Sequence, residues 1–366
     1  MILKLTLLLF LLGLNPLFAQ DQQKGINFSK HKFLFGYGFK KTNHPEVFQG
    51  NKKRRNYFEG WYFKMVSADQ SSILSIIPGI SLSHDGKEQH AFIQIIDGKT
   101  AKTSYYSFPI ELFSFSKKEF AIHIGQNYFS ADKIILNIQN DSSNISGEIQ
   151  IANNVKLNSY KKSNKDIMGW YRFVPFMECY HGVVSLTNQL DGTLNKNGQI
   201  YNFNKGLGYI EKDWGSSMPS AWIWMQSNHF SKGNASFMLS IANIPWLGKS
   251  FTGFLGFFLH DNIIYRFATY THAKLTIEKS GLYTTKATIK DKNNTFIIEA
   301  GRNQAGLLKA PVKGSMDRRI PESIDAKLIL KVLDKIGNTI FSDSTSIAGL
   351  ELVGDQNILV NSSKKQ

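Results

Sequence analysis

Short apolar or alternating segments, separated by turn residues, run along almost the whole chain from Tyr57 onward, and helical periodicity is almost absent. Glycine follows aspartate or asparagine between several of these segments, at Gly86, Gly98, Gly192 and Gly198. Such dipeptides predict tight antiparallel hairpins. About twenty strands are too many for one small barrel. We therefore predict an all-β fold of two antiparallel β-barrel or sandwich domains with few helices.

The N-terminal segment predicts export. One lysine precedes the apolar run from Leu5 to Leu12, and the segment ends at Ala19. This order is typical of a secretory signal peptide, residues 1–19, which is then cleaved. A membrane anchor fits less well, because Pro16 interrupts a run that is shorter than the roughly twenty residues needed to span a bilayer. We expect a periplasmic or extracellular protein.

The rest of the chain divides by composition. Residues 20–56 are polar and irregular, and the tail at 356–366 is predicted to be disordered. The basic polar stretch 158–165 interrupts the strand pattern and is the predicted junction. The predicted boundaries are therefore 57–165 for the first β domain and 166–355 for the second.

Charge and cysteine content limit the classes of partner. Cys179 is the single cysteine, so the chain cannot close an intramolecular disulfide and depends on its core. The formal net charge is +15, with a basic run at Lys52–Arg55, which favours anionic partners. No nucleic-acid module is visible, so we expect no nucleic-acid partner but a peripheral contact with an anionic membrane surface. The alternative is a solvated basic surface.

The segment GYIEKDWG, residues 208–215, places two acids at two-residue spacing. In a strand, residues i and i+2 lie on one face. Glu211 and Asp213 are therefore predicted to share a face, while Lys212 points the other way. Beside large aromatic residues, such acids suggest an apolar cavity that contains a proton source.

The segment WIWMQSNHF follows shortly afterwards and begins apolar on both faces. Trp222 and Trp224 are predicted to stand side by side, with Trp214 just upstream. Indole faces stabilise a nearby cation, although two adjacent indoles are also typical of an ordinary core. Buried amide and imidazole groups at Gln226 and His229 need partners.

An upstream segment, YFEGWYFK, repeats the combination of an acid and an indole. Glu59 and Trp61 are predicted to share a strand face with Phe63 and Met65. A carboxylate there is either a polar anchor at a cavity rim or a partner of backbone amides or of Arg55.

The segment at 169–186, GWYRFVPFMECYHGVVSL, carries further candidates. Glu178 and Tyr180 are predicted on one face, and Cys179 and His181 on the other. His181 fits a general acid, a metal ligand or a hydrogen-bonded core histidine. We predict no metal site, because the sequence has no HxH or HExxH spacing.

Four blocks of the chain resemble the tocopherol cyclase family, in the same order as in that family. They are RRNYFEGWYFK at 54–64, GWYRFVPFMECYHGVVSL at 169–186, GYIEKDWGSSMPSAWIWMQSNHF at 208–230 and EAGRNQAGLLKAPVKG at 299–314. The matching blocks extend from about Arg54 to Asp355. The resemblance implies two lipocalin-like β-barrels, as in the distantly similar hydroxyneurosporene synthases.

The resemblance also implies a reaction, namely closure of a chromanol ring on a prenylated hydroquinone. Protonating an alkene gives a tertiary cation, which the phenolic oxygen traps. No cofactor is needed. The expected partner is thus a hydrophobic small molecule, a prenylquinol or another isoprenoid lipid, held away from water.

Residue roles follow from the resemblance. We expect Glu211 or Asp213 to donate the proton, with Glu178 and His181 as further catalytic candidates. The plant motif has asparagine where this chain has Asp213, which favours Glu211. The expected substrate-binding residues are Glu59, Trp61, Tyr180, Trp214, Trp222, Trp224, Gln226 and His229.

Two other functions fit the same sequence. One is a non-catalytic, extracytoplasmic lipocalin-like carrier of a hydrophobic isoprenoid or lipid. The other is an isoprenoid hydratase, in which water traps the cation. A carrier needs an apolar pocket without a buried acid, whereas a cyclase needs Glu211 or Asp213 pointing inward beside the indoles.

Overall fold

The computed structural model describes residues 37–140, 143–157, 166–175, 177–246 and 248–363. The predicted signal peptide, 1–19, and the predicted junction, 158–165, lie outside these residues. Within the described part of the chain, no helix has both the length and the apolar character needed to cross a membrane.

The first sheet has the strand order β4-β3-β2-β1-β12-β10-β9-β8-β7-β6-β5, with β11 paired to β10. Its strands are β1 (Tyr57–Val66), β2 (Ile73–Leu82), β3 (Gln89–Asp97), β4 (Thr103–Pro109), β5 (Phe113–Phe115), β6 (Ala121–Ile124), β7 (Asn127–Ser130), β8 (Lys133–Asn140), β9 (Ser143–Val155), β10 (Cys179–Lys196), β11 (Gln199–Asn202) and β12 (Gly206–Gly215).

The second sheet has the order β16-β15-β14-β13-β22-β21-β19-β18-β17, with β20 paired to β21. Its strands are β13 (Trp222–Ser227), β14 (Ala235–Trp246), β15 (Lys249–His260), β16 (Ile263–Ala268), β17 (Lys274–Ser280), β18 (Thr284–Lys290), β19 (Asn294–Gly301), β20 (Gly306–Val312), β21 (Ser315–Asp334) and β22 (Thr339–Val353). Strand pairing within both sheets is antiparallel.

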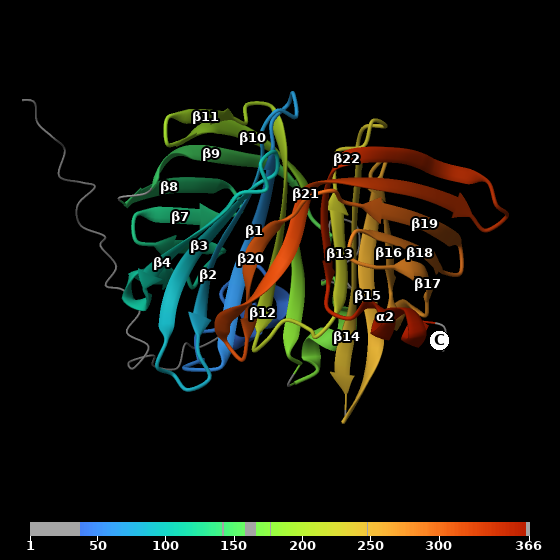
Figure 1. Ribbon diagram of the computed structural model, residues 1–366, viewed down its shortest axis with the longest axis horizontal. Coiled ribbons are helices and arrows are strands. Elements are labelled where there is room, and N and C mark those ends of the chain that lie inside the picture. Colours follow the sequence, from blue (N-terminus) through green and yellow to red (C-terminus); the bar gives the residue numbers. More distant parts are fainter. Residues whose placement is uncertain (1–36, 141–142, 158–165, 176, 247, 364–366) are drawn as a thin grey trace, which may run out of the picture.

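The two sheets share one topology. In each, the first strand in the chain pairs with the last, β1 with β12 and β13 with β22. The edge strands of each sheet are consecutive in the chain: a 3₁₀ turn at Ile110–Leu112 joins β4 to β5, and one at Thr269–Thr271 lies between β16 and β17. Such short links require the sheet to curl until its edges approach, which gives the two curved units in Figure 1. The prediction of an all-β fold with two lipocalin-like antiparallel units is confirmed.

The division between the sheets differs from the predicted boundary. The chain changes sheets between Gly215 and Trp222, not at 158–165, because β10 and β12 complete the first sheet beside β1. Gly215 ends β12 at a positive φ of 155°, where a Cβ atom would collide with the carbonyl of Glu178.

Two short helices lie where the sequence predicted irregular or disordered segments. Helix α1 (Tyr37–Asn43) falls within the predicted irregular region 20–56. Helix α2 (Gln356–Ser363) occupies most of the predicted disordered tail, with Leu359 fully buried. The Gln356 amide donates hydrogen bonds to the carbonyls of Trp222 (3.3 Å) and Val353 (2.8 Å). These bonds attach the start of α2 to the second sheet.

Strand alternation sorts side chains between three apolar clusters. On β1, Trp61 and Phe63 belong to the core of the first sheet, whereas Tyr62 belongs to a cluster between the sheets. On β13, Ile223 belongs to the core of the second sheet, whereas Trp222 and Trp224 belong to the cluster between the sheets. The period of two thus gives each of these strands one face inside its own sheet and one face at the junction.

The hairpin of β20 and β21 joins the two sheets. It extends from the second sheet across the first, as Figure 1 shows for the orange strands. Gln94 on β3 bonds both backbone groups of Lys309 on β20, accepting from its N–H at 2.7 Å and donating to its carbonyl at 3.2 Å. The Ser81 hydroxyl donates to the carbonyl of Gly314 at 2.7 Å. These contacts enclose the space between the sheets.

Candidate active site

A cavity of ≈ 200 Å³ lies between the two sheets. Strands β1, β10 and β12 line it from the first sheet, and strands β13, β14, β21 and β22 from the second. Much of its wall is apolar and includes Phe92, Met168, Trp222, Trp224, Phe254 and Leu308. The cavity is therefore at the junction of the units rather than inside either one.

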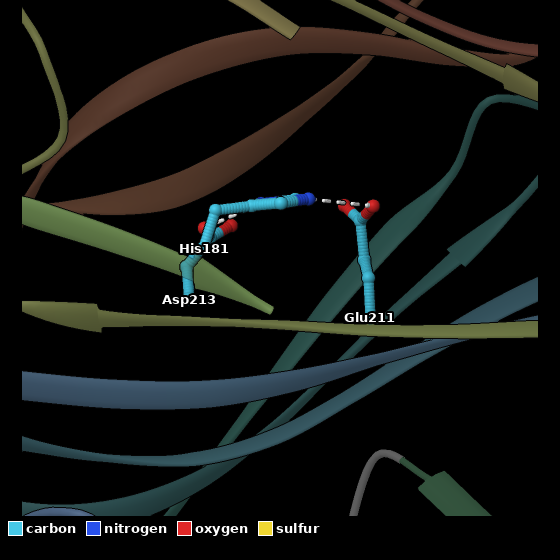
Figure 2. A group of neighbouring side chains, drawn as sticks. All are labelled: His181, Glu211 and Asp213. Carbon is cyan, nitrogen blue, oxygen red and sulfur yellow. Dashed lines mark hydrogen bonds and ion pairs between the residues drawn. The ribbon is translucent and has the colours of Figure 1, made fainter. Parts of the chain in front are cut away.

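His181 stands between two carboxylates at this cavity, as Figure 2 shows. Its Nδ1 lies 2.9 Å from Asp213 Oδ1, and its Nε2 lies 3.5 Å from Glu211 Oε2. The three residues come from adjacent strands, since His181 on β10 is the cross-strand partner of Asp213 on β12. As predicted, Glu211 and Asp213 share one face, and Lys212 points away from them into the first sheet.

Glu211 is a buried acid with several donors. Its Oε2 accepts hydrogen bonds from the Tyr209 hydroxyl (2.6 Å) and from Trp224 Nε1 (3.2 Å). Burial raises the pKa of Glu211 to about 7, against the lowering effect of His181, while Asp213 adds to the increase. A carboxyl group with this pKa is substantially protonated at neutral pH.

The two acids change the pKa of His181 in the direction opposite to the effect of burial. Burial by itself lowers the pKa of His181, but the charges of Glu211 and Asp213 together raise it to about 9. The imidazole is therefore a protonated group within reach of Glu211, oriented by its bond to Asp213. This arrangement can deliver a proton to Glu211 after Glu211 has given one away.

The same three residues form a candidate metal cluster, since their possible ligand atoms all lie within 4.8 Å of one another. The two imidazole nitrogens point in opposite directions, however, and Asp213 is bonded at Nδ1. An ion bound at Nε2 could be shared with Glu211 but not with Asp213. One imidazole and one carboxylate are fewer than the three protein ligands of a typical catalytic zinc site, so the geometry fits a proton relay better.

A second pair of acids faces the cavity from the second sheet. Glu322 on β21 and Glu351 on β22 are direct cross-strand partners, and both line the cavity. The Tyr62 hydroxyl donates to Glu322 Oε1 at 2.6 Å, and Trp222 Nε1 donates to Glu351 Oε2. Burial raises the pKa of Glu322 to about 7, and burial together with Glu322 raises that of Glu351 further.

Sequence reasoning missed Glu322, Glu351 and Tyr62. The available signal was a single acid inside an otherwise apolar stretch, as in GLELV around Glu351, whereas Glu211 was identified by its two-residue spacing from Asp213 beside tryptophans. Other predicted candidates do reach the cavity: Glu178, Trp222 and Trp224 line it. Cys179 lines it as well, with a pKa that burial raises well above the ordinary thiol value.

Glu59 and Trp61 were predicted at the cavity, and this prediction is wrong. Glu59 is fully buried in the first sheet, 2.5 Å from the Lys212 ammonium, and it accepts from the backbone N–H groups of Gln49 and Gly50. Lys212 lies 4.6 Å from the ring centre of Trp61. The alternative, a carboxylate that bonds backbone amides, describes Glu59 correctly.

Tyr180 and Trp214 also lie outside the cavity lining. They stack on each other at 5.6 Å, on the strand faces opposite to His181 and Asp213, and Tyr180 donates to the carbonyl of Val174 at 2.7 Å. They support the strands that carry the acids instead of contacting a ligand.

Gln226 and His229 belong to a separate polar group around Lys64 and do not line the cavity. The buried Lys64 ammonium donates to the Ile347 carbonyl (2.8 Å) and to Gln226 Oε1 (3.2 Å). Burial lowers the pKa of Lys64 to about 7, and burial with the charge of Lys64 lowers that of His229 to about 3. The prediction that Gln226 and His229 bind substrate at this cavity is therefore wrong.

Comparison with known proteins gives a family match. The sequence model of tocopherol cyclase-like proteins matches residues 118–354. A chloroplast protein of Oryza sativa subsp. japonica named "Probable tocopherol cyclase" is 30% identical over 78 residues, 21% of this chain and 17% of the rice protein. The chloroplast tocopherol cyclase of Zea mays is 27% identical over 82 residues, 22% of this chain and 17% of the maize protein. The matched segments therefore span about a sixth of these plant proteins.

Among solved structures, that of CghA with Sch210972 has a TM-score of 0.50 and 8% sequence identity, and the match covers 82% of this chain and 89% of that chain. At this identity the likeness concerns the fold alone.

Proposed function

Because the chain belongs to the tocopherol cyclase-like family, we propose that it is an enzyme that protonates an alkene of a prenylated hydroquinone and closes a chromanol ring. The reaction is an isomerisation, so substrate and product have the same composition and no electrons are exchanged with a cofactor. The proposal rests on one observation above all: the Glu211 carboxyl lies at an apolar cavity with an indole on one side and the His181–Asp213 pair on the other.

The proton moves in a defined sequence. The Glu211 carboxyl gives its proton to the alkene carbon nearer to the ring, and the positive charge develops on the tertiary carbon. The phenolic oxygen attacks that carbon, a C–O bond forms, and the hydroxyl proton leaves to a base. His181, protonated and 3.5 Å from Glu211 Oε2, then restores the proton of Glu211. Such positioned proton transfer contributes roughly 10²–10⁴-fold to a rate.

The cavity wall suits a cationic intermediate. Trp222 and Trp224 line it, and a dry indole face stabilises a nearby cation by about 2 kcal/mol or more. The apolar lining also limits the access of water, which would trap the tertiary cation as an alcohol. These features favour capture by the phenol of the substrate itself over hydration.

A carrier of hydrophobic ligands gains nothing from buried carboxyl groups, since each acid is costly to bury beside an apolar ligand. The inward position of Glu211 therefore favours an enzyme. The test is to incubate purified protein with 2-geranyl-1,4-benzoquinol under reducing conditions and to analyse the products by mass spectrometry. A cyclase gives an isomer of unchanged mass, a hydratase gives a product that has gained one water, and a carrier returns the bound quinol unchanged.

The Glu211→Gln variant identifies the donor in the same assay. We expect cyclisation to fall by roughly 10² or more, because the amide has no acidic proton to give. The matched control is Glu119→Gln, which makes the same change at an exposed position in the first unit and should keep full activity. Full activity of Glu211→Gln would show that the proton comes from another group.

A further inference from the structure

The two sheets share one topology, and corresponding strands in each carry a cross-strand pair of titratable side chains. In the first sheet, the neighbouring strands β10 and β12 carry His181 and Asp213 as cross-strand partners. In the second, the corresponding strands β21 and β22 carry Glu322 and Glu351 as cross-strand partners. All four side chains line the same cavity between the sheets. The fold thus places a titratable pair on each of two facing walls.

The two walls are also linked by reciprocal hydrogen bonds. Tyr62 on β1 of the first sheet donates to Glu322 of the second at 2.6 Å. Trp224 on β13 of the second sheet donates to Glu211 of the first at 3.2 Å. Since β1 and β13 are corresponding strands, each sheet supplies the donor that orients the acid of the other. The positions of Glu211 and Glu322 are therefore fixed relative to each other.

The carboxyl groups of Glu322 and Glu351 share a proton. Two ionised carboxylates directly opposite each other on buried strands repel strongly. Burial raises the pKa of both groups, and the charge of Glu322 raises that of Glu351 further, so one of these cross-strand partners carries a proton. The buried Glu322 Oε2 has no hydrogen-bond partner among the described residues, so it can accept a donor from the substrate. With one proton between them, the pair retains one negative charge and can accept a second proton.

Ring closure needs a group that can accept a proton from the substrate hydroxyl. The alkene carbon gains a proton and the hydroxyl oxygen loses one, at two different places on the substrate. Resting on the function proposed above, we infer that Glu322, paired with Glu351, is the base that removes the hydroxyl proton as the C–O bond forms. The substrate then lies with its alkene at the Glu211 wall and its hydroxyl at the Glu322 wall. Once His181 has reprotonated Glu211, each turnover leaves His181 short of one proton and the Glu322–Glu351 pair with one extra, and exchange with water after product release restores both.

Charged and titratable groups around Glu322 agree with this assignment. Tyr62 bonds its Oε1, Glu351 lies opposite, Glu211 faces it across the cavity, and the Lys64 ammonium favours its ionised form. The hydrogen bond from Tyr62 and the charge of Lys64 stabilise the carboxylate that must be present before the hydroxyl proton arrives.

Two probes separate the two proton transfers. The first is 2-geranyl-1,4-benzoquinol, which can close the ring. The second is its dimethyl ether, which has the same alkene but no hydroxyl proton. In D₂O, reversible protonation of the ether alkene inserts deuterium at the alkene carbon without any need for a base at the hydroxyl site. Ring closure of the quinol and deuterium uptake by the ether are both measured by mass spectrometry for wild type, Glu211→Gln, Glu322→Gln and the exposed control Glu119→Gln.

We expect Glu211→Gln to lose both activities. Glu322→Gln should close the ring of the quinol at least roughly 10²-fold more slowly but take up deuterium into the ether within about twofold of the wild-type rate. A merely structural role of Glu322 would lower both rates together and overturn the inference, as would full ring closure by Glu322→Gln. If wild type converts neither probe, the proposed function fails and the inference fails with it. If wild type closes the ring and Glu322→Gln does too, only the inference fails.

A second variant covers the case in which Glu322→Gln does not fold. Glu351→Gln replaces the shared proton by a fixed amide donor, which keeps Glu322 ionised to lower pH. Ring closure should persist, with the rising limb of its pH–rate profile moved to lower pH. An unchanged profile in this variant would overturn the role of the pair.

Discussion

The hydroxyl of Tyr62 in the first sheet donates a 2.6 Å hydrogen bond to the Glu322 carboxylate in the second sheet. The same hydroxyl accepts a 2.8 Å bond from Ser75 Oγ, so its proton is directed at Glu322. Burial raises the pKa of Glu322 to about 7, and the bond from Tyr62 opposes that increase by stabilising the carboxylate. The contact therefore joins the two sheets and also sets the proton affinity of a cavity acid.

Replacing Tyr62 by phenylalanine should have two effects. The pKa of Glu322 rises, so the rising limb of the pH–rate profile moves to higher pH. The loss of a buried bond to a carboxylate lowers the free energy of unfolding by about 1–3 kcal/mol. The pH profile of quinol cyclisation and urea unfolding measure these effects.

The matched control for this variant is Tyr106→Phe. Tyr106 also loses a hydroxyl bond, 2.8 Å to Ser143 Oγ, but that bond lies outside the cavity lining. The control should keep the wild-type pH profile, and a profile of Tyr62→Phe that matches it would contradict the role assigned to Tyr62.

Replacing Asp213 by asparagine tests the relay behind Glu211. Burial lowers the pKa of His181, and the charges of Glu211 and Asp213 raise it to about 9. Removing the Asp213 charge lets that pKa fall, so the descending limb of the pH–rate profile moves to lower pH. We expect kcat to fall roughly 10-fold or more while KM changes little, because Asp213 positions and charges the imidazole. The control is Asp317→Asn, which makes the same change at an exposed position. An unchanged descending limb of the pH–rate profile in Asp213→Asn would exclude proton transfer from His181 to Glu211.

Local alternation explains what the sequence could predict of this site. In GYIEKDWG the two-residue spacing places Glu211 and Asp213 on one face and Lys212 on the other, because strand geometry depends only on near neighbours. Trp222 and Trp224 follow the same rule. Which face meets a cavity depends on pairing between distant strands, and that information is not local.

The wrong and the missed site predictions arise because the pairing between distant strands is not visible in the local sequence. Glu59 has the same acid-and-indole pattern as Glu211, yet its face turns into the first sheet, where Lys212 neutralises it. Glu322 and Glu351 were missed because a lone acid in an alternating strand is most often solvent-facing. Only the pairing of β21 with β22, and the packing of one sheet against the other, makes these two acids neighbours in a cavity.

The buried Glu59–Lys212 pair should matter for stability rather than for chemistry. The two charges lie 2.5 Å apart, both fully buried, and Lys212 also donates to the carbonyls of Pro45 (2.7 Å) and Val47 (2.6 Å). Glu59→Gln leaves the Lys212 charge without its partner, so the free energy of unfolding should fall by about 3–5 kcal/mol. Urea unfolding measures the loss, and cyclisation per folded molecule should stay unchanged.

The double variant Glu59→Leu/Lys212→Met provides the control for that prediction. It removes both charges together, and it should be more stable than Glu59→Gln alone. If the single variant is as stable as wild type, the pair does not hold the segment at 45–50 in place.

The basic run at Lys52–Arg55 carries the predicted membrane contact. All four side chains are exposed, so they are available to an anionic surface. The protein should bind vesicles that contain phosphatidylserine at low salt and leave them at high salt, because the Debye length falls from about 30 Å at 0.01 M to about 3 Å at 1 M. Replacing the four residues by glutamine should weaken sedimentation with these vesicles, and neutral phosphatidylcholine vesicles are the control. Equal binding to both vesicle types would contradict the prediction.

The cavity acids also predict how stability depends on pH. Burial raises the pKa of Glu211 and of Glu322 from 4.5 to about 7, so between these values the folded protein binds more protons than the unfolded chain. The stabilisation from each group is complete below about pH 4.5 and is lost as pH rises through about 7. His181 acts in the same direction at higher pH, because its pKa rises from 6.5 to about 9. These three groups therefore lower the free energy of unfolding between pH 5 and pH 9, each with a slope of at most about 1.4 kcal/mol per pH unit. His229 and Lys64, whose pKa values burial lowers to about 3 and about 7, act in the opposite direction. Urea midpoints measured across this range should fall less steeply between pH 5 and 7 in Glu211→Gln and Glu322→Gln than in wild type or Glu119→Gln, because glutamine does not titrate. Equal pH dependence of the midpoint over this interval in wild type and in both variants would show that the two acids are ionised in the folded protein.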